Sequence, residues 1–288
     1  MLVVGGSSSH ELAKKIAKHR KVPYSSLKVG HFPDGETFVR FMKPVKGKNV
    51  VLVQSMVPPN QSIIEILFAA HTAKELGARK VSLVVPYLAY MREDARFHPG
   101  ECISAGVLAK AIVPPLDFLV TVDPHLHRFH NLHKVYHVHV KRVTANGLIA
   151  DHIKRHIKNP LVVGPDGESE QWAKQVAEQV GCPVTVMTKT RYSGTKVKVH
   201  FKDKVDYEGM HICLVDDIIS TGHTLMQNIK HLRKMGVKKI TCFGVHGLFV
   251  GDAYKELKRL KVDIVTSNTI PHPSNRLDVS GLLAEAIE

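Results

Sequence analysis

Short runs of apolar and β-branched residues recur along the chain and predict strands. We expect strands at Val50–Val53, Val81–Val85, Phe118–Val122, Leu161–Val163, Val184–Met187, Ile212–Val215, Ile240–Phe243 and Ile264–Thr266. Amphipathic segments between them predict helices over Ile63–Leu76, Gln171–Val180 and Leu225–Met235, and each is followed by a glycine that can adopt positive φ. Because apolar strands alternate with helices, the pattern predicts an α/β protein with mainly parallel sheets flanked by helices.

One part of this pattern occurs twice. Residues 75–82 match residues 234–241: each has a helix end, a glycine, a small residue, a basic pair and the start of a strand. An apolar strand also precedes the helix in both copies, at 50–53 and at 212–215. The match predicts two similar α/β units. Two unrelated βαβ units of similar composition are the alternative.

A length of 288 residues is enough for two ordinary domains. Together with the repeat, the length places a first domain at 1–141 and a second at 142–288. The last stretch, 277–288, is a candidate to pack back on the first domain.

The composition predicts a packed globular protein without a membrane segment. Hydrophobic residues make up 44% and charged residues 23%. No apolar run approaches the roughly 18 residues of a membrane helix, and the first residues do not resemble a signal peptide. The four cysteines are scattered, which favours reduced thiols and a cytoplasmic location.

The net charge of +14 and the pI near 9.6 favour anionic partners. A single-strand nucleic-acid binder would place basic residues beside aromatic ones. Aromatic residues are only 6% here, and lysines and arginines are spread along the chain. We therefore expect phosphorylated small molecules and no nucleic acid, and a basic surface without a partner is the plain alternative.

The second copy of the repeat carries a candidate sugar-phosphate site, which the first copy lacks. Two adjacent carboxylates follow its strand and can accept hydrogen bonds from ribose hydroxyls. The next residues supply hydroxyl groups, a glycine for close approach, and the N-terminus of a helix, which favours phosphate. The candidate residues are Asp216, Asp217, Ser220, Thr221, Gly222, His223 and Thr224. An acidic turn with an ordinary helix cap is the alternative.

This segment resembles the phosphoribosyl-diphosphate-binding loop of type I phosphoribosyltransferases and of ribose-phosphate diphosphokinases (phosphoribosyl pyrophosphate synthetases). Further motifs resemble the diphosphokinases. Phe32-Pro33-Asp34-Gly35-Glu36 is similar to their F-x-D-G-E motif, and Pro86-Tyr87 with Arg92-Glu93-Asp94 and Arg96 is similar to P-Y-x-R-Q-D. Asp123-Pro124-His125 resembles D-L-H, Pro165-Asp166 resembles part of S-P-D, and Lys189-Thr190-Arg191 resembles the catalytic K-x-R.

The resemblance implies transfer of the diphosphoryl group of Mg-ATP to the C1 hydroxyl of ribose 5-phosphate, with two domains of the type I phosphoribosyltransferase kind. It implies Mg²⁺ held by His125 and Asp166, and catalysis by Lys189, Arg191 and His125. The implied ATP-binding residues are Phe32, Asp34, Glu36, Arg92, Asp94, Arg96 and His125. Because the F-x-D-G-E motif serves a neighbouring subunit in the family, the resemblance also implies a homo-oligomer, a dimer or an assembly of dimers.

The departures from the family pattern are local. Glu93 stands where glutamine is usual, Pro124 where leucine is usual, and residues 167–169 replace a small or basic stretch. These differences put nucleotide choice and metal affinity in doubt. The histidine-rich run from His125 to His139 has no spacing typical of a zinc site.

The segment after Arg191, Tyr192-Ser193-Gly194-Thr195, is a candidate lid, with an exposed hairpin as the alternative. Two other functions stay open. A phosphoribosyltransferase would use the same loop with a base. A non-catalytic regulatory homologue would bind nucleotides and assemble with an active enzyme.

Overall fold

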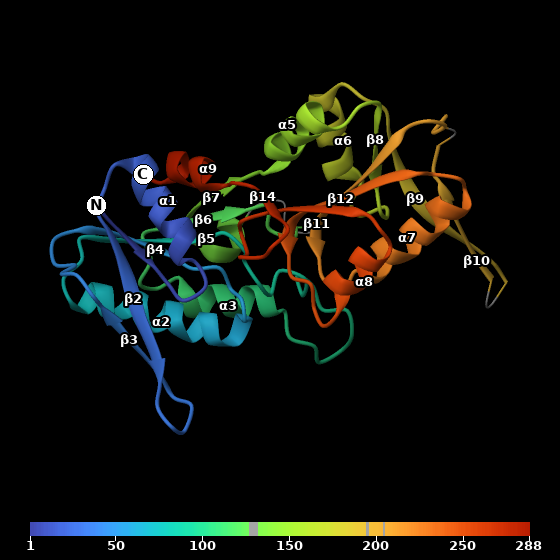
Figure 1. Ribbon diagram of the computed structural model, residues 1–288. Helices are drawn as coiled ribbons and strands as arrows, with labels where there is room; N and C mark the ends of the chain where they lie inside the picture. Colours follow the sequence, from blue (N-terminus) through green and yellow to red (C-terminus); the bar gives the residue numbers. More distant parts are fainter. Residues whose placement is uncertain (127–131, 194–195, 204) are drawn as a thin grey trace. The chain divides into compact units, whose positions relative to one another are not determined.

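The computed structural model describes residues 1–126, 132–193, 196–203 and 205–288, leaving out the side chains of residues 134, 189–193 and 196–199. The chain divides into two compact units, which are treated one at a time (Figure 1). Unit 1 contains Met1–Val143, Thr269–Pro271 and Val279–Glu288, and unit 2 contains Thr144–Asn268 and His272–Asp278.

Unit 1 has a seven-stranded sheet in the order β3-β2-β1-β4-β5-β6-β7. Only β2 and β3 pair antiparallel; the other pairs are parallel. The strands are β1 (Leu2–Gly5), β2 (Tyr24–His31), β3 (Thr37–Phe41), β4 (Asn49–Val53), β5 (Lys80–Val85), β6 (Phe118–Val122) and β7 (His139–Val143). The helices are α1 (His10–Arg20), α2 (Pro59–Glu75), α3 (Ser104–Ile112), α4 (His133–Tyr136) and α9 (Ser280–Ala286).

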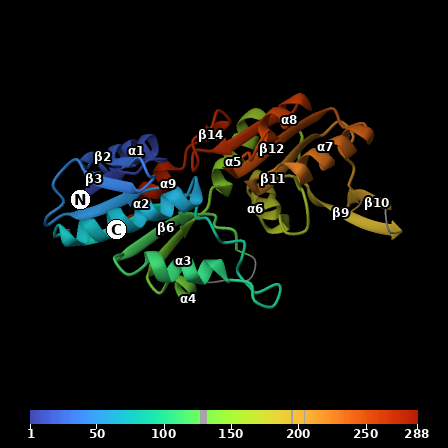
Figure 2. The ribbon, with the colours of Figure 1, turned by 90° about the horizontal axis from the view of Figure 1, so that it is seen from below.

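Helices cover both faces of this sheet. Helices α1 and α9 lie together on one face, and α2 and α3 lie on the other (Figure 2). Helix α9 is tied to α1 by Arg20, whose Nη1 donates to the carbonyl oxygen of Ala284 at 3.5 Å. Residues 279–288 therefore complete the covering layer of unit 1.

Unit 2 repeats this arrangement with the order β10-β9-β8-β11-β12-β13-β14. Again only the edge pair, β9 and β10, is antiparallel. The strands are β8 (Pro160–Gly164), β9 (Val184–Ser193), β10 (Lys196–Phe201), β11 (His211–Ile219), β12 (Lys239–Gly247), β13 (Asp263–Ser267) and β14 (Asn275–Leu277). The helices are α5 (Asn146–His156), α6 (Glu170–Val180), α7 (His223–Lys234) and α8 (Ala253–Arg259).

The registers of the two sheets correspond residue by residue near the centre. Leu2 of β1 pairs with Val50 of β4, and Leu161 of β8 pairs with Ile212 of β11. This makes Gly5 equivalent to Gly164, and Val53 equivalent to Val215. The prediction of an α/β protein with two similar, mainly parallel sheets is confirmed.

All eight predicted strands are present, but the structure extends three of them well beyond the predicted ends, including β12, which continues to Gly247 instead of Phe243. Strand β9 continues to Ser193 instead of Met187, and β11 continues to Ile219 instead of Val215. The three predicted helices are also present, and the glycines after them, Gly77, Gly181 and Gly236, have φ of 82°, 78° and 89°. The predicted domain boundary at residue 141 falls inside β7, and the compact unit ends at Val143.

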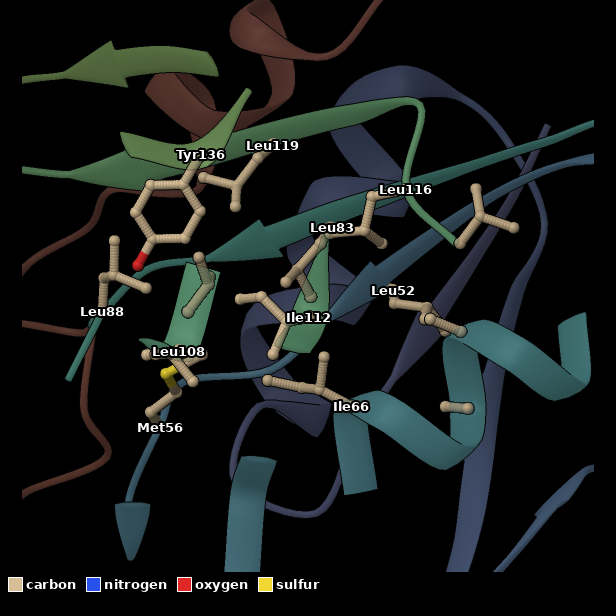
Figure 3. Packing of buried hydrophobic residues seen from close by; sticks show 14 of the residues in the cluster. Leu52, Met56, Ile66, Leu83, Leu88, Leu108, Ile112, Leu116, Leu119 and Tyr136 are labelled. Carbon is tan, nitrogen blue, oxygen red and sulfur yellow. The ribbon is translucent and has the colours of Figure 1, made fainter. Parts of the chain in front are cut away.

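The core of each unit lies between the sheet and its helices. In unit 1 the leucines of β4, β5 and β6 meet Ile66 of α2 and Ile112 of α3, and the buried Tyr136 closes the cluster (Figure 3). In unit 2 the corresponding cluster joins β8, β11 and β12 to Leu225, Ile229 and Leu232 of α7. Burial of these apolar side chains from water is the main stabilising contribution to each unit. Within the described residues, no helix is long and apolar enough to cross a membrane.

Candidate active site

The strand order of each sheet reverses at its centre, between β1 and β4 in unit 1 and between β8 and β11 in unit 2. In open α/β sheets, ligands bind beyond the carboxyl ends of the strands at such a reversal, because the connections diverge there and leave a crevice. Each unit therefore has one such switch point, and the residues at the two differ.

At the switch point of unit 2 the neighbouring strands differ in length. Strand β8 pairs with β11 only as far as Val163 and Leu214, whereas β12 continues beside β11 to Gly247 and Ile219. Asp216 therefore lies beyond the last residue pair between β8 and β11. We expected the strand to end at Val215, and this was wrong: the two aspartates stand within β11, and the connection to α7 is only Ser220–Gly222.

Three carboxylates influence one another at this switch point. The pKa of Asp216 is raised well above its ordinary value of 3.8, first by burial and then by the charges of Asp217 and Asp166. The backbone N–H of Asp217 donates to Asp216 Oδ1 at 3.0 Å, and Asp217 itself is 3% exposed. Accumulated negative charge with little water is an environment that a cation or hydroxyl donors would stabilise.

Asp166 is fixed in a tight turn after β8. Its Oδ1 accepts a hydrogen bond from the Ser169 backbone N–H at 3.1 Å, and its own N–H donates to Ser169 Oγ at 3.1 Å. The carbonyl oxygen of the preceding Pro165 accepts a hydrogen bond from Asn228 Nδ2 of α7 at 2.7 Å. Sequence reasoning missed Asn228, although a polar residue on the same helical face as Leu225 and Leu232 was a visible signal.

The candidate phosphate-binding segment is a short turn that leads directly into α7. Gly222 has φ of 69° and occupies the N-cap of α7, where no side chain caps the helix. A Cβ at this position would lie 3.2 Å from Leu257 Cδ1. Ser220 and Thr224 are half-buried, and Thr221 and His223 are exposed. The first N–H groups of α7, together with these hydroxyls, can receive a phosphate.

The donor chemistry at this switch point fits Mg²⁺. Carboxylate oxygens are its preferred protein ligands, and it is usually held by one or two of them together with substrate phosphates and water. Among the residues that the structure describes, no group of three His, Cys, Asp or Glu side chains is arranged to hold a metal ion alone.

Lys189 and Arg191 lie on β9, in the antiparallel hairpin with β10. Their backbones pair with Val199 and Val197. The backbone thus forms the hairpin that the sequence offered as the alternative to a lid. The side chains of both residues lie outside the described part of the chain, as do residues 194 and 195 of the predicted lid.

In unit 1, the Phe32–Glu36 motif forms the turn of the β2–β3 hairpin. Phe32 N–H donates to the Glu36 carbonyl at 2.8 Å, and Gly35, with φ of 94°, donates to the Phe32 carbonyl at 2.9 Å. Asp34 Oδ1 accepts from the Glu36 N–H at 3.1 Å. The Phe32 side chain is 52% exposed on this turn. The motif therefore projects an aromatic ring and two carboxylates from the sheet edge.

The other unit 1 candidates follow the carboxyl ends of β5 and β6, which are neighbours in the sheet. Arg92 and Arg96 are exposed, and Arg96 Nε donates to the Glu101 carbonyl at 2.9 Å. Asp94 is 6% exposed. His125 is half-buried two residues beyond Asp123, which has φ of 31°. The structure thus gathers these residues at one edge, while His127 and His130 of the histidine-rich run lie outside the described residues.

The switch point of unit 1 is filled by its own side chains. Gln54 Nε2 donates to Glu65 Oε2 at 3.0 Å, and Ser7 Oγ donates to the same oxygen at 2.6 Å. Gln54 Oε1 accepts from the Ser8 N–H at 3.2 Å, in the space above Gly6 where a Cβ would be only 2.2 Å away. The next residue, Ser55, donates to the carbonyl oxygen of Thr269.

Comparisons with known proteins agree with this division. The model of the N-terminal domain of ribose phosphate pyrophosphokinase matches residues 1–114, and that of the phosphoribosyl transferase domain matches residues 139–278. The chain is 31% identical over 296 residues to a ribose-phosphate pyrophosphokinase of Sulfurisphaera tokodaii, with 100% of each chain covered. The chain belongs to the ribose-phosphate pyrophosphokinase family.

Other members of the ribose-phosphate pyrophosphokinase family support the same assignment. The enzyme of that name from Methanopyrus kandleri is 32% identical, over 100% of this chain and 99% of its own. The crystal structure of phosphoribosylpyrophosphate synthetase from Mycobacterium smegmatis superimposes with a TM-score of 0.87 at 27% identity, covering 99% of this chain and 96% of that one. The family resemblance predicted from the motifs is confirmed over the whole length.

Proposed function

We propose that this protein transfers the diphosphoryl group of ATP to the C1 hydroxyl of ribose 5-phosphate, giving 5-phosphoribosyl 1-diphosphate and AMP for nucleotide biosynthesis. The observation that carries the proposal is the set of residues at the switch point of unit 2. There, carboxylates at the end of β11 adjoin a phosphate-binding turn at the start of α7. Family membership supports the same reaction.

Ribose 5-phosphate would bind with its phosphate at the N-terminus of α7 and its hydroxyls at Asp216 and Asp217. The groups for the phosphate would be Ser220, Thr221, Gly222, His223 and Thr224. Both ends of the sugar phosphate would then be fixed by one strand–turn–helix segment, which orients the C1 hydroxyl for attack.

ATP would bind through Arg92, Asp94, Arg96 and His125, with Phe32, Asp34 and Glu36 serving the ATP of a neighbouring subunit. Phosphoryl transfer requires positioning and neutralisation of charge on the transferred group. Lys189 and Arg191 would supply that neutralisation from the β9–β10 hairpin, lysine by a point contact and arginine by a two-pronged one. The hairpin closing over the phosphates would exclude water.

Mg²⁺ is the proposed cofactor, with Asp166 and His125 as its protein ligands. When bound, the ion would neutralise charge on the ATP phosphates. The fixed turn of Asp166 supports this role, because the hydrogen bond from the Ser169 N–H to Oδ1 restricts the direction of the carboxylate. A homo-oligomer and a cytoplasmic location complete the proposal.

The test is AMP formation from ATP and Mg²⁺ with and without ribose 5-phosphate. We expect AMP only when the sugar phosphate is present, in equal amount to phosphoribosyl diphosphate. Release of diphosphate that depends on an added base would instead indicate a phosphoribosyltransferase. Well-folded protein that forms no sugar-dependent AMP would exclude the proposed reaction and favour a regulatory homologue.

A further inference from the structure

Asn228 is an unexpected residue in the core of unit 2. It is 0% exposed and stands on the face of α7 that also carries the buried Leu225, Ile229 and Leu232. Its Oδ1 is one of the buried side-chain atoms without a hydrogen-bond partner in the described part of the chain. Asparagine is a poor helix former, and a buried amide with an unpaired oxygen is unfavourable. An apolar side chain would suit this position better if packing alone mattered.

The other end of the Asn228 amide makes a specific contact. Nδ2 donates to the Pro165 carbonyl oxygen at 2.7 Å, and only the nitrogen can face a carbonyl in this way. Pro165 is the residue before Asp166. One hydrogen bond therefore joins the helix whose N-terminus forms the candidate phosphate site to the turn that carries a candidate metal ligand.

Unit 1 has an equivalent contact with different chemistry. There Glu65 of α2 accepts a hydrogen bond from Ser7, and Ser7 is equivalent to Asp166 by the strand register. In both units the helix after the switch point is thus tied to the turn after the first central strand. In unit 1 the contact occupies the side chain of the turn, whereas in unit 2 it uses only a backbone carbonyl and leaves the Asp166 Oδ2 available.

We propose that Asn228 is a positioning residue that holds the Pro165–Asp166 turn at a fixed distance from α7. It keeps the Asp166 carboxylate placed for a divalent cation, relative to a phosphate bound at the N-terminus of the same helix. The proposal rests on the proposed function only for the identity of the ligands; the tether itself is a property of unit 2.

The chain offers a matched control in Asn146, the first residue of α5. Asn146 is 1% exposed, its Nδ2 donates to Gln175 Oε1 at 2.7 Å, and its Oδ1 also lacks a partner among the described residues. Loss of either amide removes one hydrogen bond of 2.7 Å from a buried asparagine, although the bond of Asn146 reaches the exposed Gln175. Only Asn228 contacts the turn that carries Asp166.

The experiment compares Asn228→Leu and Asn228→Ala with Asn146→Leu, after unfolding midpoints have shown that each variant is folded. Two quantities are measured: the free Mg²⁺ concentration that gives half-maximal AMP formation, and the amide hydrogen exchange of residues 164–170 in metal-free protein. We expect both Asn228 variants to need about 10-fold more Mg²⁺, with the KM for ribose 5-phosphate changed less than about 2-fold. Their exchange at Asp166 and Ser169 should be faster, and Asn146→Leu should change neither quantity.

Equal effects in the Asn228 and Asn146 variants would overturn the proposal, because they would indicate general loosening of unit 2. Unchanged exchange at residues 164–170 in the Asn228 variants would also overturn it. The exchange measurement needs no turnover, so it tests the tether even if wild-type protein forms no AMP, which would reject the proposed function alone.

Discussion

The two switch points of this protein have the same strand order and register, but they carry different side chains. By register, Ser7, Gln54 and Ser55 of unit 1 are equivalent to Asp166, Asp216 and Asp217 of unit 2. The unit 1 residues are neutral and bond to one another, to Glu65 or to the backbone. The unit 2 residues are all acids, and the charges of Asp217 and Asp166 raise the pKa of Asp216. In unit 1 the side chains form a hydrogen-bonded network, although Glu65 Oε1 lacks a partner within the described residues, whereas in unit 2 neighbouring carboxylates repel one another.

In this duplicated fold, the polar residues at one switch point stabilise the unit, and those at the other are available to bind a ligand. A polar group buried at a strand end must find a partner, because an unpaired one is costly. Unit 1 supplies partners for Ser7, Gln54 and Ser55 from its own chain, so these hydrogen bonds contribute to stability. Unit 2 instead brings the charges of Asp216, Asp217 and Asp166 close enough to raise the pKa of Asp216, so a cation or hydroxyl donors bound there would reduce the repulsion.

The edge hairpins, β2–β3 in unit 1 and β9–β10 in unit 2, also differ at equivalent positions. Counting from the paired residues Val3–Tyr24 and Val162–Val184, Lys189 of β9 corresponds to Val29 of β2. Alanine at Lys189 is expected to lower kcat by about 10²- to 10³-fold with a much smaller change in KM, because charge neutralisation matters most in the transition state. Steady-state kinetics of AMP formation measure this.

The control for this variant is Lys28→Ala, which removes an exposed lysine from the hairpin of unit 1. We expect its kcat to stay within about 2-fold of wild type, since surface substitutions rarely have larger effects. Unchanged turnover in Lys189→Ala would contradict a catalytic role for Lys189 on the unit 2 hairpin.

Placing an acid of unit 2 at the equivalent position of unit 1 tests whether the hydrogen bonds at that switch point stabilise the unit. Gln54→Asp removes the amide donor to Glu65 and brings a second carboxyl group close to it. We expect the free energy of unfolding to fall by about 2 to 4 kcal/mol, because a buried hydrogen-bond partner is lost and like charges meet. Urea unfolding at pH 7 measures the loss. Wild-type stability would show that the network of unit 1 has no structural role.

The reverse change in unit 2 should stabilise the ligand-free protein. The folded state holds the Asp216 proton to higher pH than the unfolded chain does, so wild-type stability falls as pH rises above the ordinary value of 3.8. Asp216→Asn avoids this fall. We expect the variant to unfold about 2 to 4 °C higher than wild type at pH 7, for a gain of about 1 kcal/mol, with the difference vanishing near pH 4.

Thermal unfolding in the absence of Mg²⁺ and ribose 5-phosphate measures this difference, and Asp216→Asn should also lose activity. A variant that is less stable than wild type at pH 7 would mean that the carboxylate is already well paired. Protein groups would then stabilise the acids of unit 2, as they do the polar side chains of unit 1.

The sequence predicted the α/β class and eight strands, because strands buried on both faces are continuous apolar runs. It missed β1, a central strand of unit 1, although Leu2–Gly5 is buried. It also predicted the region of the sugar-phosphate site. It failed at the end of β11, since adjacent aspartates are unfavourable in strands and suggested a loop. The mixed polar strand β2 was missed for a similar reason.

Contacts between distant segments could not be predicted in this way. Nothing in the sequence near Gln54 indicates that Glu65 and Ser7 pair with it, and nothing near Asp166 indicates the bond from Asn228 to Pro165. These contacts depend on how helices pack over the sheet. The raised pKa of Asp216 also follows from that packing, because it requires both burial and the approach of Asp166.

The discontinuity of unit 1 has a consequence for how the chain folds as it is synthesised. Residues 269–271 and 279–288 belong to unit 1 but follow nearly all of unit 2 along the chain. A nascent chain therefore contains six of the seven strands of unit 2 before Thr269 can accept its hydrogen bond from Ser55, and all seven before α9 can cover α1. Domains generally fold from the N-terminus as they emerge from the ribosome. In this protein the first unit to be translated is the last to be completed.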